Sequence, residues 1–336
     1  MKENYRAWEI DYDEFFRQTS DRDRLKFLVR FAVLAPSSHN SQPWRFEVTE
    51  NEILVKPDMQ RALPKSDTNN RQLFISLGCA IENLLVAADY YGLATQINYQ
   101  NDGAVISLQE IRQESSQDKN HLIFSILKRH TNRNPYENRM PDEHFLTWIK
   151  NLANSEMRID CITDQNAKNK IADIVVAAGI AAMDDDGFRE ELSRYMKSNL
   201  TRASVGMPMF GFGMATPVSL AASFMLKRFN MNKLSHKQDE KLLKEHTPGM
   251  VVISTKGDNS GTWIQAGRIY EKIALMAERN NIKTAPMAAA IQIRDFYQDL
   301  QKTLNISYRP QIFFRIGYSD KITNHSPRLS VSEVSR

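Results

Sequence analysis

The sequence predicts an α+β protein built from two similar units in tandem. Segments with helical periodicity and segments with strand periodicity alternate along 336 residues, a length that fits two domains. Two long apolar segments, 71–93 and 262–282, can be aligned so that Gly78 meets Gly267. Each apolar segment follows residues with the pattern of a strand and precedes an extended segment. This shared order indicates a duplicated unit.

The first half reads as a helix, two strands, a long helix and two more strands. Ser20 or Asp21 can cap the first helix, and Pro36 ends it. Alternation of polar and apolar residues predicts the strands, and the long helix is apolar almost all round, which indicates burial. The expected elements are a helix over 21–35, strands over 44–50 and 51–57, a helix over 71–93, and strands over 95–100 and 104–111.

The second half begins again with a helix, near residue 119. The units are therefore predicted to span 20–118 and 119–336. An irregular, partly helical stretch over about 186–246, rich in methionine and aromatic residues, is expected as an insertion that forms a lid or pocket wall. The other expected elements are helices over 120–130, 141–154, 166–183 and 262–282, and strands over 157–164, 249–255 and 310–319.

Composition narrows the function classes. A net charge of +4 is too small to indicate a nucleic-acid partner. Two distant cysteines, without CxxC or HExxH, predict neither a disulfide scaffold nor a metal site. The N-terminus lacks the apolar core of a signal peptide, and no uninterrupted apolar run reaches about 18 residues. A cytoplasmic protein without a membrane partner is expected.

Two arginine-bearing motifs could bind phosphate. In the segment 128–135, Arg129, Thr131 and Arg133 alternate, so an extended backbone would turn all three to one side. Guanidinium groups match phosphate oxygens in pairs. Arg328, which follows a proline near the C-terminus, could reach the same group. The alternatives are a solvated basic turn and a tail arginine in solvent.

The segment 36–44, PSSHNSQPW, is dense in small hydrogen-bonding side chains. Ser37, Ser38, Asn40 and Gln42 could line the edge of a flat heterocycle, because hydroxyl and amide groups both donate and accept. The alternative is a helix-to-strand connection whose polar groups satisfy the local backbone. No GxGxxG, P-loop or GxSxG motif is present to indicate another cofactor or a serine nucleophile.

Taken together, these motifs resemble the flavin-dependent nitroreductase superfamily. The elements that carry the resemblance are RHTNR, PSSHNSQPW, GCAIENLLVAADYYGL, RIGYS and SPRLSVSEV. The loop precedes the arginine motif by about ninety residues, and the second half has only an echo of the loop at 214–219. This order is similar to the Acg-like branch, in which two units are fused. The resemblance implies a nitroreductase-like fold, an intramolecular pseudo-dimer, and one flavin site shared by both halves.

The resemblance also implies the chemistry. FMN would be held without a covalent bond, its phosphate by Arg129, Thr131, Arg133 and Arg328, and its ring or ribityl chain by Ser37, Ser38, Asn40 and Gln42. Ala288 and Ala289 would present backbone N–H groups to the flavin N5. No catalytic side chain is expected, because the flavin carries the reaction.

NAD(P)H would be the transient reductant, and a nitroaromatic or quinone-like molecule would accept the hydride in ping-pong order. The alternative function is FMN storage with little turnover. Either a monomer or a homodimer is compatible with the fusion. Removing Arg129 and Arg133 together is expected to strip FMN and leave the fold intact.

Overall fold

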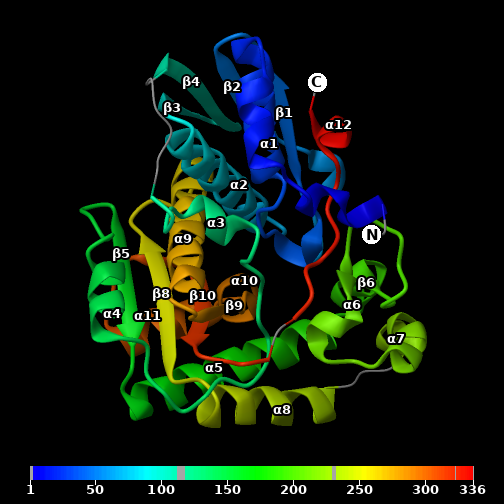
Figure 1. The fold of residues 1–336 in the computed structure, drawn as a ribbon. Coiled ribbons are helices and arrows are strands. Elements are labelled where there is room, and N and C mark those ends of the chain that lie inside the picture. Colours follow the sequence, from blue (N-terminus) through cyan, green and yellow to red (C-terminus); the bar gives the residue numbers. More distant parts are fainter. Residues whose placement is uncertain (1–2, 112–117, 229–231, 322, 336) are drawn as a thin grey trace.

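The computed structural model describes residues 3–111, 118–228, 232–321 and 323–335 (Figure 1). Within them the chain forms two four-stranded antiparallel sheets, one in each half. The strand order is β1-β2-β4-β3 in the first sheet and β5-β8-β10-β9 in the second. The strands are β1 (Trp44–Val48), β2 (Glu52–Pro57), β3 (Leu93–Gln100), β4 (Gly103–Ile111), β5 (Met157–Ile162), β8 (Gly249–Thr255), β9 (Lys283–Pro286) and β10 (Arg309–Gly317).

Helices fill the space between the two sheets and cover the second half (Figure 1). The α-helices are α1 (Asp21–Ala32), α2 (Arg71–Tyr90), α3 (Ile123–Ile126), α4 (Glu143–Lys150), α5 (Gln165–Asp184), α6 (Asp186–Tyr195), α7 (Thr216–Arg228), α8 (Asn232–Glu245), α9 (Ser260–Arg279), α10 (Ala289–Gln292), α11 (Phe296–Leu304) and α12 (Val331–Val334). Short 3₁₀ helices are η1 (Glu3–Trp8), η2 (Tyr12–Arg17), η3 (Ser38–Asn40), η4 (Met59–Arg61) and η5 (Met209–Phe212), and β6 (Met196–Lys197) pairs with β7 (Met207–Pro208).

The predicted α+β class is confirmed, and one predicted helix is shorter than expected. Helix α1 begins where the capping signal indicates, because Ser20 Oγ accepts a hydrogen bond from the backbone N–H of Asp23. Helix α3 ends at Ile126, although the sequence predicts a helix over 120–130. The chain leaves the helix because Thr131 forms a parallel bridge with Thr284, an edge residue of the second sheet.

The two long helices cross at a pair of glycines. A Cβ on Gly78 of α2 would lie 2.0 Å from the carbonyl oxygen of Ile264 on α9. A Cβ on Gly267 of α9 would lie equally close, 2.0 Å, to the carbonyl oxygen of Ile75 on α2. The reciprocal contacts mean that the backbones touch, so both positions require glycine. The crossing lies in the main hydrophobic core, to which both halves contribute.

Both halves follow the same order of elements. In each, two strands precede the long helix and two follow it, and the strands take corresponding places in their sheet. The halves differ between their first two strands: β1 and β2 are joined by a tight turn, whereas α5 to α8 separate β5 from β8. The predicted insertion over 186–246 thus contains α6, α7 and α8.

The C-terminal segment returns from the second half to the first (Figure 1). After β10 it passes beside the N-terminus, where the N–H of Arg328 donates to the carbonyl of Asn4, and it ends at α12 near β1. Ser335 forms an isolated bridge with Phe46 of β1. Helix α2 is the one helix among the described residues that is long and apolar enough to span a bilayer, but 78% of that window is buried, as expected of a core helix.

Candidate functional site

Two adjoining cavities lie where the loop 36–44, the arginine segment 128–135 and the two long helices meet. We call them the arginine cavity and the helix cavity. The arginine cavity, about 60 Å³, is lined by Trp8, Pro36, Ser37, Asn40, Arg129, His130, Thr131, Arg133, Met207, Gly211, Arg328 and residues 323–326. The helix cavity, about 240 Å³, is lined by residues 36–39, Gln72, Ile75, Ser76, Cys79, Thr131, Arg133, Met207, Tyr270, Pro286, Ala288 and Ile312.

Eight of the ten residues predicted from sequence line these cavities. Pro36, Ser37, Thr131, Arg133 and Met207 belong to both, so the cavities share a wall. Segments ninety residues apart in sequence therefore meet at one place. The eight are Ser37, Ser38, Asn40, Arg129, Thr131, Arg133, Ala288 and Arg328.

Gln42 and Ala289 line neither cavity. The Gln42 side chain is fully buried and connects two other segments, because its Nε2 donates to the carbonyl of Ser204 at 2.7 Å and its Oε1 accepts from the N–H of Leu329 at 2.9 Å. Ala289 packs against the second, smaller apolar cluster. The predicted contacts of Gln42 and Ala289 with FMN stay predictions, and the proposed site is built on the eight residues that line the cavities.

The first arginine of the motif is held by a buried carboxylate. Arg129 Nε lies 3.0 Å from Glu271 Oε1 of α9, and the two side chains are 3% and 0% exposed. The contact lies outside hydrogen-bond geometry, and the buried Nη1 of Arg129 has no hydrogen-bond partner among the described residues. A buried guanidinium with an unsatisfied N–H is costly, so this group favours an incoming acceptor.

Arg133 faces the cavities without a carboxylate partner in the described part of the chain. Its guanidinium lies over the ring of Phe212, 4.5 Å from the ring centroid, and its Nη2 lies 4.0 Å from Met207 Sδ. Burial lowers the pKa of Arg133 to about 10, still well above neutral pH. This cation is therefore available to an anion.

Arg328 is anchored by the loop. Its Nη1 donates to Asn40 Oδ1 at 2.8 Å, and its Nη2 donates to the carbonyl of Leu34 at 3.1 Å. The Asn40 amide in turn donates to the carbonyls of Gly206 and Pro327. Burial, and to a lesser extent Arg129, lowers the pKa of Arg328 to about 9. Asn40 therefore positions an arginine as well as lining the cavity.

The loop has an unusual backbone that explains its composition. His39, Asn40 and Gln42 each have φ of 53°, a region that costs energy for residues other than glycine. Ser37 Oγ accepts from the N–H of Gln42 at 2.9 Å and stabilises this shape. The alternative interpretation, a helix-to-strand connection, is therefore partly right, because the Ser37 hydroxyl hydrogen-bonds to the backbone of the loop itself.

Several site residues were not predicted from sequence. Trp8 and His325 stack with ring centroids 4.0 Å apart and close one side of the arginine cavity, beside His130. Tyr270 lines the helix cavity, with a buried hydroxyl close to the side chain of Thr284. The sequence offered no distinct signal for Tyr270, because α9 carries several other polar residues.

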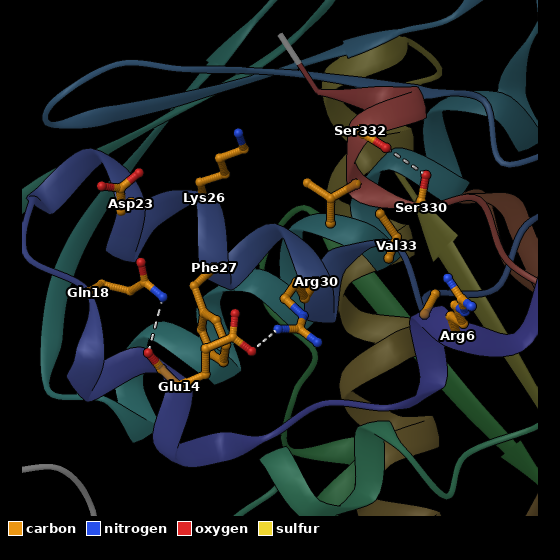
Figure 2. Close-up of a pocket in the computed structure, with 12 residues that line it drawn as sticks. Arg6, Glu14, Gln18, Asp23, Lys26, Phe27, Arg30, Val33, Ser330 and Ser332 are labelled. Atoms are coloured by element: carbon orange, nitrogen blue, oxygen red, sulfur yellow. Dashed lines mark hydrogen bonds and ion pairs between the residues drawn. The ribbon is translucent and has the colours of Figure 1, made fainter. Parts of the chain in front are cut away.

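Another cavity, of about 400 Å³, lies between η2, α1 and the C-terminal segment (Figure 2). Its cations and carboxylates are mixed: Arg30 pairs with Glu14, and Asp23 lies at the rim. Unlike the arginine cavity, it does not gather guanidinium groups around one point. It therefore offers no comparable place for a phosphate.

The arginine cavity fits a phosphate, and the helix cavity fits a flat ring. Together their volumes lie at the lower end of the range for small-molecule sites, roughly 300–1,000 Å³. Three guanidiniums line the first cavity, whereas the walls of the second combine apolar side chains with hydroxyl, amide and imidazole groups. Within the described residues, no group of three or more His, Cys, Asp or Glu side chains could hold a metal ion.

Comparisons with known proteins agree with the motifs. No family model matches the chain. It is 23% identical over 326 residues to Rv3131 of Mycobacterium tuberculosis, covering 94% of this chain and 91% of that protein, and 20% identical over 322 residues to the acg protein of the same organism, covering 93% and 95%. Both carry the provisional name NAD(P)H nitroreductase.

The chain is a homologue of the Acg-like nitroreductases. Similarity to these Acg-like proteins extends through both halves, because the alignments cover more than nine-tenths of the chain. Among solved structures, the FMN-dependent nitroreductase NfnB from Mycobacterium smegmatis, in complex with NADPH, is 16% identical, with a TM-score of 0.43, over 63% of this chain and 95% of that one.

Proposed function

We propose that the protein is an FMN-dependent oxidoreductase that uses NAD(P)H to reduce a nitroaromatic or quinone-like small molecule. The two half-reactions would alternate at one site, in ping-pong order. The names of the Acg-like homologues support the reaction class. The electron acceptor is proposed only as a chemical class, since the site offers no group specific for one molecule.

One observation carries the proposal: the loop and the arginine motif line adjoining cavities that share a wall. Ser37, Thr131 and Arg133 belong to both cavities, so a ligand with an anionic end and a flat end could occupy both. FMN has this shape. Among the described residues, Arg133 has no carboxylate partner and Nη1 of Arg129 has no hydrogen-bond partner, and both facts support a phosphate at the first end.

In this proposal the chain supplies binding, orientation and electrostatics. Arg129, Thr131, Arg133 and Arg328 would hold the phosphate, and we call these four residues the clamp. Ser37, Ser38, Asn40 and Ala288 would contact the ring or ribityl chain. Bound FMN would supply the hydride chemistry, so no nucleophilic side chain is required. Ile75 and Ile312 give the ring end apolar walls that exclude water.

The insertion forms part of the cavity wall. Met207 lines both cavities, and Phe212 covers the guanidinium of Arg133. We propose that this wall limits which substrates reach the ring. We also propose that the units 20–118 and 119–336 arose by duplication and act as an intramolecular pseudo-dimer in the cytoplasm. Their identical strand orders support the duplication.

A spectroscopic experiment tests the proposal. The purified protein, saturated with FMN, is mixed with NADPH without oxygen, and absorbance near 450 nm is followed. Rapid bleaching, then recovery when a quinone or nitroaromatic is added, is the expected result. Protein that binds no FMN would contradict the proposal.

A second function, storage of FMN with little turnover, is favoured by the residues of the insertion that cover the site. Met207 and Gly211 already line the arginine cavity, so the wall could keep NAD(P)H from the ring. The same experiment separates the two functions. A flavin spectrum that persists for minutes in excess NADPH and NADH would support storage.

A further inference from the structure

Glu271 is a buried acid that the proposed reaction does not use. Its side chain is 0% exposed and lies against the Nε of Arg129, at 3.0 Å. Neither of its carboxylate oxygens has a hydrogen-bond donor among the described residues. A carboxylate in such a place is stable only while a nearby cation offsets the cost of burial.

The charged groups that act on Glu271 come from three parts of the chain. Arg129, beyond α3, and Arg328, in the C-terminal segment, both favour the ionised carboxylate. Glu82 of α2 opposes it, although Glu82 itself pairs with Arg268 at 3.0 Å. Neighbouring α2 and α9 also place the neutral groups of Cys79 and Tyr270 nearby. Its stabilising cations are thus two arginines of the clamp.

We propose that Glu271 is a positioning residue coupled to proton uptake: it holds Arg129 in the empty site and takes up a proton when a phosphomonoester dianion binds the clamp. The inference rests on the proposed function. The dianion offsets the charge of the guanidiniums that stabilise the Glu271 carboxylate. The proton comes from solvent, and no bond other than the new carboxyl O–H forms.

The direction of the pH dependence follows from this coupling. Burial raises the pKa of Glu271 to about 7, against the opposing effect of Arg129. Binding of the dianion raises the pKa of Glu271 further, because a negative charge now lies beside the carboxylate. Between these two pKa values the bound protein carries one more proton than the empty protein. Affinity for FMN therefore falls as pH rises through this window, up to about tenfold per pH unit.

Calorimetric titration of the flavin-free protein with FMN tests the inference. At pH 8.0, in two buffers of different ionisation enthalpy, binding is expected to take up between about 0.5 and 1 proton per FMN. Glu271→Gln keeps a polar oxygen beside Arg129 but cannot ionise. FMN binding to this variant should take up almost no protons. Its dissociation constant for FMN should change less than about threefold between pH 7.5 and 8.5.

Glu82→Gln is the matched control, because Glu82 is a buried acid at the corresponding position of α2, away from the clamp. It should still take up protons when FMN binds, because Glu271 can ionise, although loss of the Glu82 charge shifts this uptake to lower pH. Uptake of less than about 0.2 proton per FMN by the wild type would overturn the inference. This outcome needs no variant, so it decides the question even where a variant does not fold. Equal uptake by wild type and Glu271→Gln would also overturn it. Failure of FMN to bind would instead contradict the proposed function.

Discussion

Arg133 and Arg129 line the same cavity but differ in their partners. Arg133 contacts an aromatic ring and a thioether, whereas Arg129 contacts a buried carboxylate. Removing Arg129 would leave Glu271 buried and unpaired, which typically costs about 3–5 kcal/mol. Loss of both arginines is therefore expected to lower stability as well as FMN binding, and Arg133 is the cleaner site to change.

The first prediction concerns Arg133→Met. Methionine keeps packing against Phe212 but cannot bind phosphate. Loss of charge-assisted hydrogen bonds worth about 1.5–3 kcal/mol should weaken FMN binding about 10- to 150-fold, measured by fluorescence titration. Thermal stability of the flavin-free protein should change little.

The control is Arg158→Met on β5, where an exposed arginine pairs with Asp160. It should bind FMN as the wild type does. Unchanged affinity in Arg133→Met would contradict the role assigned to the clamp.

The second prediction concerns His325, which stacks on Trp8. Burial, with nearby positive charges, lowers the pKa of His325 to about 3 in the folded protein. The unfolded chain therefore binds the proton first, near pH 6.5, and this residue's contribution to stability is lost as pH falls below that value. In His325→Phe, which keeps the stack, the free energy of unfolding should fall about 2 kcal/mol less between pH 7 and 5 than in the wild type.

Urea denaturation of flavin-free protein at the two pH values measures this difference. The contributions of other titrating groups cancel when the variant is compared with the wild type. An identical loss of stability in both proteins would show that His325 is protonated in the folded state.

Helices α2 and α9 position the helix cavity through their close crossing. Ile75, Ser76 and Cys79 line the cavity from α2, next to the contact with Gly267, and Tyr270 lines it from α9. Separation of the helices would therefore disturb the cavity as well as the core.

The third prediction concerns Gly267→Ala. An added methyl group 2.0 Å from the carbonyl oxygen of Ile75 must push the helices apart. The cost should exceed the helix-propensity gain of about 1 kcal/mol, so thermal melting should shift down, by an amount that corresponds to about 1–3 kcal/mol. FMN affinity should also fall.

Gly179→Ala in α5 is the control, because no atom lies within 4 Å of its added Cβ. This variant should be as stable as the wild type or more stable. A stable Gly267→Ala variant would contradict the close crossing.

Much of this arrangement could be predicted from local patterns, and the limits have physical causes. Periodicity and caps predicted α1, α2, α9 and most strands, because those signals are local. The proximity of Arg129 to Glu271 depends on how the segment after α3 packs against α9, which no local pattern specifies. The same holds for Trp8, which reaches the site through the path of the N-terminus.

At the scale of the whole molecule, the proposed site takes its loop from the first half and its clamp from the second. At the start of α1, the first half carries Arg17, Thr19 and Asp21 at the spacing of the arginine motif, with an acid in the third place. Arg17 pairs with Asp11 at the surface. This substitution of charge fits the proposal that one clamp was retained after duplication.

The counterpart of the loop also differs from the sequence expectation. The prediction of a second, degenerate copy of the loop at 214–219 is wrong, because helix α7 begins at Thr216. By element order, the counterpart is the connection 151–156 between α4 and β5, which is shorter and has no PSS sequence. The second half therefore lacks the residues that would complete another site.

The flavin content of the purified protein tests the central claim most directly. The chain is saturated with FMN, freed of excess, and denatured, and the released flavin is identified by chromatography and counted against protein. The account predicts one FMN per chain. Two FMN per chain would contradict the single retained site, and a colourless protein that takes up no FMN would contradict a flavin site altogether.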